Sequence, residues 1–511
     1  MKKFLPDLIA ILAFIILSFA YFFPADIEGR ILFQHDTAAG VGAGQESKEY
    51  LERTGERTRW TNSIFGGMPT YQMSPSYDST TSLKGVEKVY RLFLPDYVVL
   101  TFIMMLGFYI LLRAFGISAW LAGLGGVIWA FSSYFFILIP AGHIWKFVTL
   151  AYIPPTIAGV VLAYRKKYLL GGIVTALFIA LQIQSNHIQM SYYFMFVILF
   201  FVGAYFEDAY KKKELPHFFK ASGVLALAAV VGVCINISNL YHTYEYSKET
   251  MRGKSELKQE GAAASQTSSG LDRDYITNWS YGIGETLTLL VPNVKGGGSG
   301  STMSQSEAAM AKANPMYNGI YSQLPQYFGE QPWTAGPVYV GAFVMFLFVL
   351  GCFIVKGPLK WALLGATIFS ILLSWGKNFM GLTDFFIDYV PMYNKFRAVS
   401  SILVIAEFTI PLLAIFALKE ILSKPDMLKQ EKNCRGVIAA LVLTAGVALI
   451  LAVAPGTFFS SFITTQEMTA LKQALPAEHL APFVANLTEM REAIIASDAW
   501  RSFFIIVIGC L

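Results

Sequence analysis

The sequence contains little charge and few of the residues that build metal-rich or disulfide-rich proteins. Only 14% of its 511 residues are charged, whereas soluble globular proteins carry about 25%. There are six histidines, and the four cysteines (Cys234, Cys352, Cys434 and Cys510) have no paired spacing such as CxxC. We therefore predict no disulfides and no zinc site.

Motifs of soluble nucleotide-dependent enzymes and metalloproteases are also missing. The sequence contains no Walker A motif, no dinucleotide fingerprint between a strand and a helix, and no HExxH. These motifs place phosphates or zinc by fixed backbone geometry, so an ATP-driven mechanism has no support. The small basic clusters that give the net charge of +5 lie between apolar runs, a pattern that indicates membrane topology rather than nucleic-acid binding.

Long apolar runs dominate the chain, and 55% of its residues are hydrophobic. A helix needs about 20 apolar residues to cross the hydrocarbon core. Runs that reach or approach this length occur at 4–23, 97–113, 118–138, 147–164, 168–184, 190–206, 221–240, 336–355, 359–375, 398–418 and 436–454. A twelfth run from Ser502 to Leu511 is too short to span, so we expect a C-terminal truncation. The fold class predicted is an all-α polytopic membrane protein with about 11–12 transmembrane helices.

Basic residues predict the orientation of these helices. Lys2 and Lys3, Arg165–Lys167 and Lys211–Lys213 fall on one side, whereas the short connections of the other side near 139–146 and 185–189 hold Lys146 alone. The positive-inside rule then places the N-terminus in the cytoplasm and the long connections outside.

This topology predicts three regions. Residues 1–240 form an N-terminal transmembrane module of about seven helices that includes the first outer loop, 24–96. Residues 241–335 form a large extracytoplasmic loop, and residues 336–511 form the C-terminal transmembrane helices.

Local composition predicts some structure in the outer loops. We expect a helix at Gln45–Glu56, a turn region at Trp60–Pro69 and an interfacial helix at Thr383–Tyr393. The polar stretches 253–270 and 296–313, rich in Ser, Ala and Gly, are predicted to be mobile or partly disordered.

The predicted topology gathers polar side chains at one membrane surface. The candidate site residues are Asp36, His143, Asn186, His187, Glu285, Glu330, Lys395 and Arg397. In such a site cations hold phosphate and a carboxylate takes a proton from an acceptor hydroxyl. Five of these residues also have a purely structural interpretation: Asp36 caps a helix, His143 and His187 form interfacial hydrogen bonds, Glu330 braces its loop, and Arg397 reaches to lipid headgroups.

Several motifs together resemble the GT-C superfamily of membrane glycosyltransferases and, more narrowly, the bacterial YfhO family. They cover about residues 1–400. The matching pieces are Asp36 with Trp60–Pro69 and Ser74–Pro75, Asn186–Tyr193, Trp279–Glu285, Tyr327–Tyr339 and Tyr393–Arg397.

The resemblance implies a GT-C-like bundle with large extracytoplasmic loops in the bacterial cytoplasmic (inner) membrane. It implies that Asp36 is the general base of an inverting transfer, from a polyprenyl-phosphate-type lipid donor to a cell-envelope glycan or polymer on the non-cytoplasmic face. Arg397, with Lys395 or His187, would then stabilise the leaving lipid phosphate. Membrane lipids are the other expected partners, and no nucleic acid is expected.

Metal dependence stays open at this point. No cofactor is certain, and a divalent metal is possible because Asp36, Glu285 and Glu330 offer hard oxygen ligands.

Two other functions remain open. A transporter or flippase for lipid-linked saccharides would need polar residues along a path through the bundle, and Glu407 is nearly the only charge deep within an apolar run. An intramembrane carboxylate is a functional hypothesis by default. A non-catalytic envelope assembly factor would depend on loop surfaces and would tolerate substitution of Asp36 and Arg397.

Overall fold

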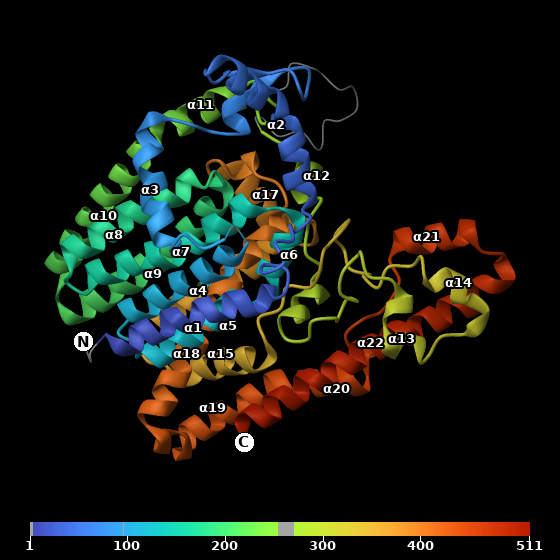
Figure 1. Cartoon of the computed structure of the whole chain (residues 1–511). Helices are drawn as coiled ribbons and strands as arrows, with labels where there is room; N and C mark the ends of the chain where they lie inside the picture. Colours follow the sequence, from blue (N-terminus) through green and yellow to red (C-terminus); the bar gives the residue numbers. More distant parts are fainter. Residues whose placement is uncertain (1–3, 96, 254–269) are drawn as a thin grey trace. The chain divides into compact units, whose positions relative to one another are not determined.

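A computed structural model describes residues 4–95, 97–253 and 270–511 (Figure 1). The chain divides into two compact units: the first contains residues 1–131 and 135–258, and the second contains 132–134 and 259–511. Lys2, Lys3 and most of the stretch 253–270, which was predicted to be mobile, lie outside the described residues.

The first unit is a helical bundle with one long connection. Its apolar helices are α1 (Leu5–Phe22), α4 (Val98–Ala114), α5 (Ala119–Ala130), α6 (Ser133–Ala141, whose first two residues belong to the second unit), α7 (Ile144–Tyr164), α8 (Tyr168–Gln184), α9 (Ile188–Lys212) and α10 (Leu215–Ile235). Almost every residue of α7 is buried, and α7 packs on α4, α8 and α9. A Cβ added to Gly159 of α7 or Gly171 of α8 would lie 2.8 or 2.7 Å from the other residue's carbonyl oxygen. Small residues at this contact therefore let the two backbones approach closely.

The long connection between α1 and α4 is ordered in short elements. These are α2 (His35–Thr54), β1 (Trp60–Thr61), β2 (Met68–Pro69), η1 (Thr70–Gln72), η2 (Asp78–Thr80) and α3 (Thr81–Tyr90), and α11 (Ile237–Ser247) follows α10. β1 and β2 pair antiparallel. The Glu46 carboxylate accepts hydrogen bonds from Thr61 Oγ1 at 2.7 Å and from the Asn62 amide at 2.8 Å, so this hairpin is tied to α2. The helix begins at His35 rather than at Gln45, which places Asp36 in its first turn.

The second unit contains further apolar helices and an irregular segment. The irregular segment holds α12 (Arg273–Thr277), η3 (Gly284–Leu289), η4 (Met303–Gln305), α13 (Glu307–Met310), η5 (Pro315–Tyr317) and α14 (Asn318–Tyr321). The later elements are α15 (Ala342–Ile354), α16 (Leu359–Ser374), η6 (Gly376–Phe379), α17 (Met380–Tyr389), η7 (Tyr393–Lys395), η8 (Val399–Leu403), α18 (Val404–Ser423), η9 (Pro425–Lys429), α19 (Glu431–Leu441), η10 (Val442–Gly446), α20 (Val447–Val453), η11 (Pro455–Thr457), α21 (Thr465–Ala474) and α22 (Ala477–Cys510). α18 packs on α15 and α16, and α22 packs on α13 and α20.

The stretch 296–313, predicted to be mobile, is packed, so this prediction is wrong. Met303 and Ala309 are fully buried in a cluster with Phe483 and Leu487 of α22. The prediction from composition failed because a few apolar residues of this polar stretch, such as Met303 and Ala309, pack against a helix far away in the sequence.

The run from Ser502 to Leu511 also differs from the prediction. It is the end of α22, which has 34 residues and is therefore about 51 Å long at 1.5 Å per residue. Charged residues interrupt the apolar run without ending the helix, since Asp498 pairs with Arg501 one turn later at 2.9 Å. α22 is therefore long enough and apolar enough to span.

The described residues contain seven helices that are long and apolar enough to cross a membrane, or up to nine if each of two bent helix pairs is one span. Three shorter apolar helices, α4, α8 and α15, occupy the remaining predicted runs. The chain is thus an all-α multi-pass membrane protein, as predicted.

Candidate functional site

The start of α2 lies in close contact with the turn between α6 and α7. The side chain of Gln34, which precedes α2, donates from Nε2 to the carbonyl of Ile139 at 2.7 Å. Gly142 has φ +81°, and a Cβ there would lie 3.0 Å from the Thr37 amide and 3.2 Å from Asp36 Cβ. Glycine is therefore required both by conformation and by the close approach of the two segments.

This approach pairs a predicted base with a predicted imidazole. Asp36 Oδ2 lies 3.0 Å from His143 Nε2, and the two side chains are 56% and 48% exposed. A half-exposed carboxylate that is oriented by an imidazole can still reach a hydroxyl of a bound molecule. Of the sequence candidates, the structure brings this pair into direct contact.

Asn186 and His187 lie in the same unit, at the turn between α8 and α9. Asn186 adopts φ +60°, a left-handed conformation that Asn tolerates better than most residues, and its Oδ1 accepts a hydrogen bond from Asn239 Nδ2 at 3.1 Å. His187 Nδ1 is buried without a hydrogen-bond partner among the described residues. Burial, aided by the nearby charge of Lys146, lowers the pKa of His187 to about 3. His187 is thus neutral at physiological pH and can contribute hydrogen bonds but no charge.

A cavity of about 330 Å³ opens in the first unit beside these residues. Its wall comes from α3 and the connection before it, the start of α7, the end of α8 and the junction of α10 and α11. Lining side chains that carry polar groups include Tyr77, Lys84, Trp145, Gln184, Asn186, Asn236 and Asn239.

Glu285 lies in the second unit and holds two loops together. It is 2% exposed and accepts hydrogen bonds from the Gly282 amide at 2.6 Å, the Tyr327 hydroxyl at 2.6 Å and the Glu330 amide at 3.2 Å. A Cβ at Gly329 would lie 2.3 Å from Glu285 Oε1, so the second loop must carry glycine there. Burial raises the pKa of Glu285.

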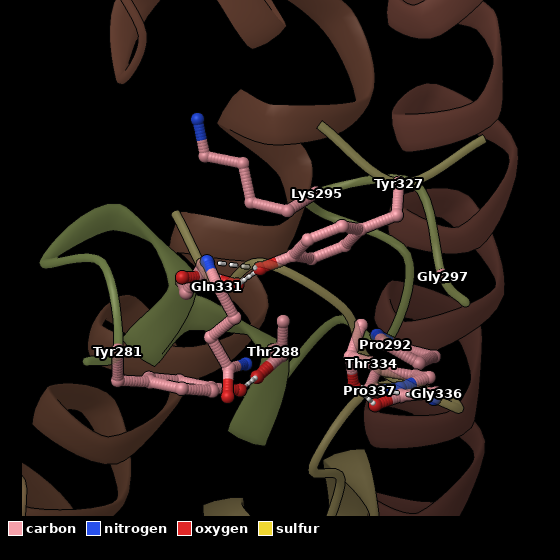
Figure 2. A pocket seen from close by; sticks show the side chains of 11 residues that line it. Tyr281, Thr288, Pro292, Lys295, Gly297, Tyr327, Gln331, Thr334, Gly336 and Pro337 are labelled. Carbon is pink, nitrogen blue, oxygen red and sulfur yellow. Dashed lines mark hydrogen bonds between the residues drawn. The ribbon is translucent and has the colours of Figure 1, made fainter. Parts of the chain in front are cut away.

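Figure 2 shows side chains that line a small cavity of the second unit, to which Glu285 also contributes; there the Gln331 backbone amide donates a hydrogen bond to the Tyr327 hydroxyl at 2.9 Å. The cavity among these side chains measures only about 10 Å³, room for at most one water molecule. Lys295 lies over the rings of Phe328 and Phe459, at 4.9 and 4.3 Å from their centroids. The contacts of Glu285 brace two loops, whereas the Glu330 side chain is exposed.

Lys395 and Arg397 occupy a strained segment of the second unit. Met392 and Ala398, on either side, have φ +69° and +57°, conformations that are costly for residues with a Cβ and that concentrate at functional sites. Arg397 donates from Nη1 to the Tyr275 hydroxyl at 2.6 Å, and its exposed guanidinium stacks 5.3 Å from the Tyr275 ring centroid. Burial lowers the pKa of Lys395.

The three oxygen donors suggested for a metal are divided between the units, with Asp36 in the first and Glu285 and Glu330 in the second. Within the described ranges, no group of three or more His, Cys, Asp or Glu side chains could hold a metal ion. Metal dependence therefore stays open, as it was from the sequence.

Sequence reasoning missed most of the cavity wall. Gln184, Asn236 and Asn239 lie at the ends of apolar runs. A polar residue at such a position is expected simply to mark the end of a membrane span, so these amides were not taken as site candidates. The sequence signal that could have found them is that these amides recur at the same ends of the predicted helices as His143 and His187. Gly142 was equally unremarkable, since its role depends on a segment that lies a hundred residues earlier in the chain.

None of the comparisons, with models of protein families, with curated proteins and with solved structures, finds a match for this chain.

Proposed function

We propose that this protein is a GT-C-like membrane glycosyltransferase, similar to the YfhO family, that moves a sugar from a polyprenyl-phosphate-type donor to a cell-envelope glycan or polymer on the outer face of the bacterial inner membrane. The observation that carries the proposal is the pair of Asp36 and His143, 3.0 Å apart and half-exposed. It supplies an oriented carboxylate in the first turn of α2, and the two residues after His143, Ile144 and Trp145, line a cavity large enough for a small ligand.

The proposed reaction is a single displacement with inversion. The Asp36 carboxylate takes the proton of an acceptor hydroxyl, and the acceptor oxygen forms a bond to the anomeric carbon of the donor sugar. The bond between that carbon and the phosphate oxygen breaks, and polyprenyl phosphate leaves with the electron pair. His143 acts as a positioning residue because its contact with Asp36 fixes the carboxylate. For Lys395 and Arg397, contact with the lipid phosphate stays a prediction, for which a planar exposed guanidinium is well suited.

The test is transfer of radiolabelled sugar in membranes that contain the protein. The donors are synthetic polyprenyl-phosphate glucose, galactose, mannose and N-acetylglucosamine, and the label is counted in envelope polymer. Loss of a general base typically costs about 10²–10⁴-fold, so Asp36→Asn should reduce transfer by that factor at normal protein levels. Asp426→Asn, at an exposed aspartate of η9, is the matched control. Retained transfer in Asp36→Asn would remove Asp36 from the role of base.

The positioning role of His143 has a separate readout. His143→Gln keeps a hydrogen-bond donor near Asp36, so it should preserve more activity than His143→Ala. The two variants should also differ in the pH profile of kcat. Equal loss in both would contradict positioning through this contact.

One observation favours transport of a lipid-linked saccharide as the second candidate. Glu407 of α18 is fully buried, and both its oxygens lack hydrogen-bond partners among the described residues. Buried carboxylates within membrane helices often serve ion or substrate pathways. In proteoliposomes with a fluorescent lipid-linked sugar, Glu407→Gln would abolish exchange between leaflets under the transport hypothesis. A transferase would leave that exchange at the background level of empty liposomes.

A further inference from the structure

The cavity of the first unit has an unusual wall that the proposed reaction does not yet explain. Asn236 and Asn239 are only 1% and 4% exposed, and both contribute to the wall together with Gln184. Asn236 Nδ2 donates to the carbonyl of Ala180 at 3.0 Å, and Asn239 Nδ2 donates to Asn186 Oδ1 at 3.1 Å. The amide nitrogens of both asparagines are therefore already used within the protein.

The side-chain amide oxygens of these three residues, in contrast, make no hydrogen bonds within the described part of the protein. Gln184 Oε1, Asn236 Oδ1 and Asn239 Oδ1 are buried and have no hydrogen-bond partner among the described residues. A buried acceptor without a donor is unfavourable, and such groups in native proteins call for an explanation. Rotation about the last bond of an amide side chain has a broad minimum, so a small rotation can turn these oxygens toward a ligand that brings several donors.

Two aromatic residues complete the chemistry of the wall. Tyr77 is fixed by His242, which lies 3.0 Å from its hydroxyl and stacks on its ring. Trp145, two residues after His143, is 43% exposed. Amide acceptors together with aromatic faces suit a sugar ring, whose hydroxyls donate hydrogen bonds and whose C–H faces pack on aromatic surfaces.

The charges at the cavity are almost balanced. Glu87 and Arg91 form an ion pair, and the Tyr152 hydroxyl closes it by donating to Glu87 at 2.9 Å. Lys84 lines the same cavity but is exposed and has no ion-pair partner among the described side chains. One cation beside a neutral polar wall suits a neutral sugar that carries one phosphate.

We infer that this cavity is the subsite for the sugar of a glycosyl phosphate, with Gln184, Asn236 and Asn239 accepting hydrogen bonds from its hydroxyls and Lys84 contacting the phosphate. The choice of a phosphate-linked sugar rests on the proposed function. The cavity volume of about 330 Å³ lies at the low end of the range for small-molecule sites, about 300–1,000 Å³. It fits a sugar ring and leaves the lipid chain outside.

Binding is tested separately from transfer, on the full chain in lipid nanodiscs. Alkyl glycoside detergents are avoided because their headgroups would compete for the cavity. The probes are the methyl glycosides of glucose, galactose, mannose and N-acetylglucosamine, and a short-chain polyprenyl-phosphate derivative of each sugar. Kd is measured by titration calorimetry, and folding of every variant is checked by size-exclusion chromatography and thermal unfolding.

The variants Asn236→Leu and Asn239→Leu keep the number and branching of the side-chain heavy atoms and remove the amide. Loss of one hydrogen bond should raise Kd for both kinds of probe by roughly 3- to 10-fold. Asn433→Leu, at an amide of α19 in the second unit, should leave Kd unchanged. Lys84→Gln should weaken only the phosphate-linked probes.

The results separate this inference from the proposed function. If no probe binds, or if folded Asn236→Leu and Asn239→Leu bind as tightly as the unchanged protein, the subsite is wrong even where sugar transfer is found. If Lys84→Gln binds the phosphate-linked probes as tightly as the unchanged protein does, the cavity does not hold the phosphate-linked donor. If the asparagine variants weaken binding while Asp36→Asn retains transfer, the subsite stands and the proposed role of Asp36 fails.

Discussion

The ion pair between Arg491 of α22 and Glu467 of α21 offers the sharpest test of how the second unit is held together. Arg491 is fully buried. Its guanidinium donates to both Glu467 oxygens at 2.7 Å and to the Phe462 carbonyl at 2.6 Å, and it lies 4.8 Å from the centroid of the Phe328 ring. Glu467→Gln removes the balancing charge and keeps the side-chain shape.

The expected magnitude follows from the burial of this pair. Breaking a buried ion pair by removing one partner costs about 3–5 kcal/mol, because an uncompensated charge stays inside. The segment that packs on α22 includes Met303, Ala309 and Tyr321, so the cost should appear as easier local opening of residues 300–324. At about 1.4 kcal/mol per tenfold change, amide exchange in that segment should accelerate by roughly 140- to 3,700-fold.

Hydrogen-exchange mass spectrometry on the protein in nanodiscs measures this change peptide by peptide. Glu431→Gln is the matched control, since the exposed pair of Glu431 and Arg435 should contribute at most about 1 kcal/mol. The double variant Glu467→Leu with Arg491→Met should regain most of the protection, because an apolar pair of similar volume avoids the desolvation cost. Unchanged exchange in Glu467→Gln, or a double variant no better than the single one, would refute the reasoning.

Three further predictions concern other described positions. Glu285→Ala should destabilise the two loops that it joins by about 1–3 kcal/mol for each buried donor left without an acceptor. Faster amide hydrogen exchange of residues 282–290 would report this change, and unchanged exchange there would contradict the bracing role. The folded-state pKa of His187, about 3, lies below its unfolded value of 6.5. Its contribution to stability is therefore present above pH 6.5 and is lost as the pH falls toward 3, by about 1.4 kcal/mol per pH unit. In His187→Phe, the temperature of thermal unfolding should therefore depend less on pH between 6.5 and 3. Gly142→Ala forces a left-handed conformation that costs about 1–2 kcal/mol and should lower sugar transfer by moving Asp36, whereas Gly203→Ala, in open space on α9, should leave transfer unchanged.

The apolar helices could be predicted because each is specified by its own local sequence. The boundaries of α8 and α4 agree closely with apolar runs read from the sequence, since lipid requires a continuous apolar stretch with internally bonded backbone. The length of α22 was underestimated because an uninterrupted apolar stretch ends at Arg501 and Asp498. The helix continues through these residues because their charges pair with each other within it.

The start of α2 could not be predicted in the same way. Its first turns are rich in Gly and Ala, and none of its residues is buried, so no hydrophobic periodicity marks them. The contacts that place it join residues far apart in the chain: Gln34 meets Ile139, and Asp36 meets His143. The sequence identified both partners of the candidate pair as polar residues at one surface, but only tertiary contacts could show that they touch.

The distribution of polar groups in the first unit argues for a site at one end of the bundle. Adjacent helices α7, α8, α9 and α10 (Figure 1) are joined by short connections, so the end of α8 lies beside the starts of α7 and α9. That end carries the buried amides, His187 and the cavity of about 330 Å³. The opposite end has a cavity of about 300 Å³ whose lining includes Arg165, Lys212 and Glu214, and it carries exposed ion pairs such as Lys166–Glu214 and Lys211–Glu207. Exposed pairs contribute little to stability, but buried amides with unused acceptors are costly and persist more readily where a ligand satisfies them. The unused buried acceptors at one end therefore support the proposed function, in which the substrate approaches from one membrane surface.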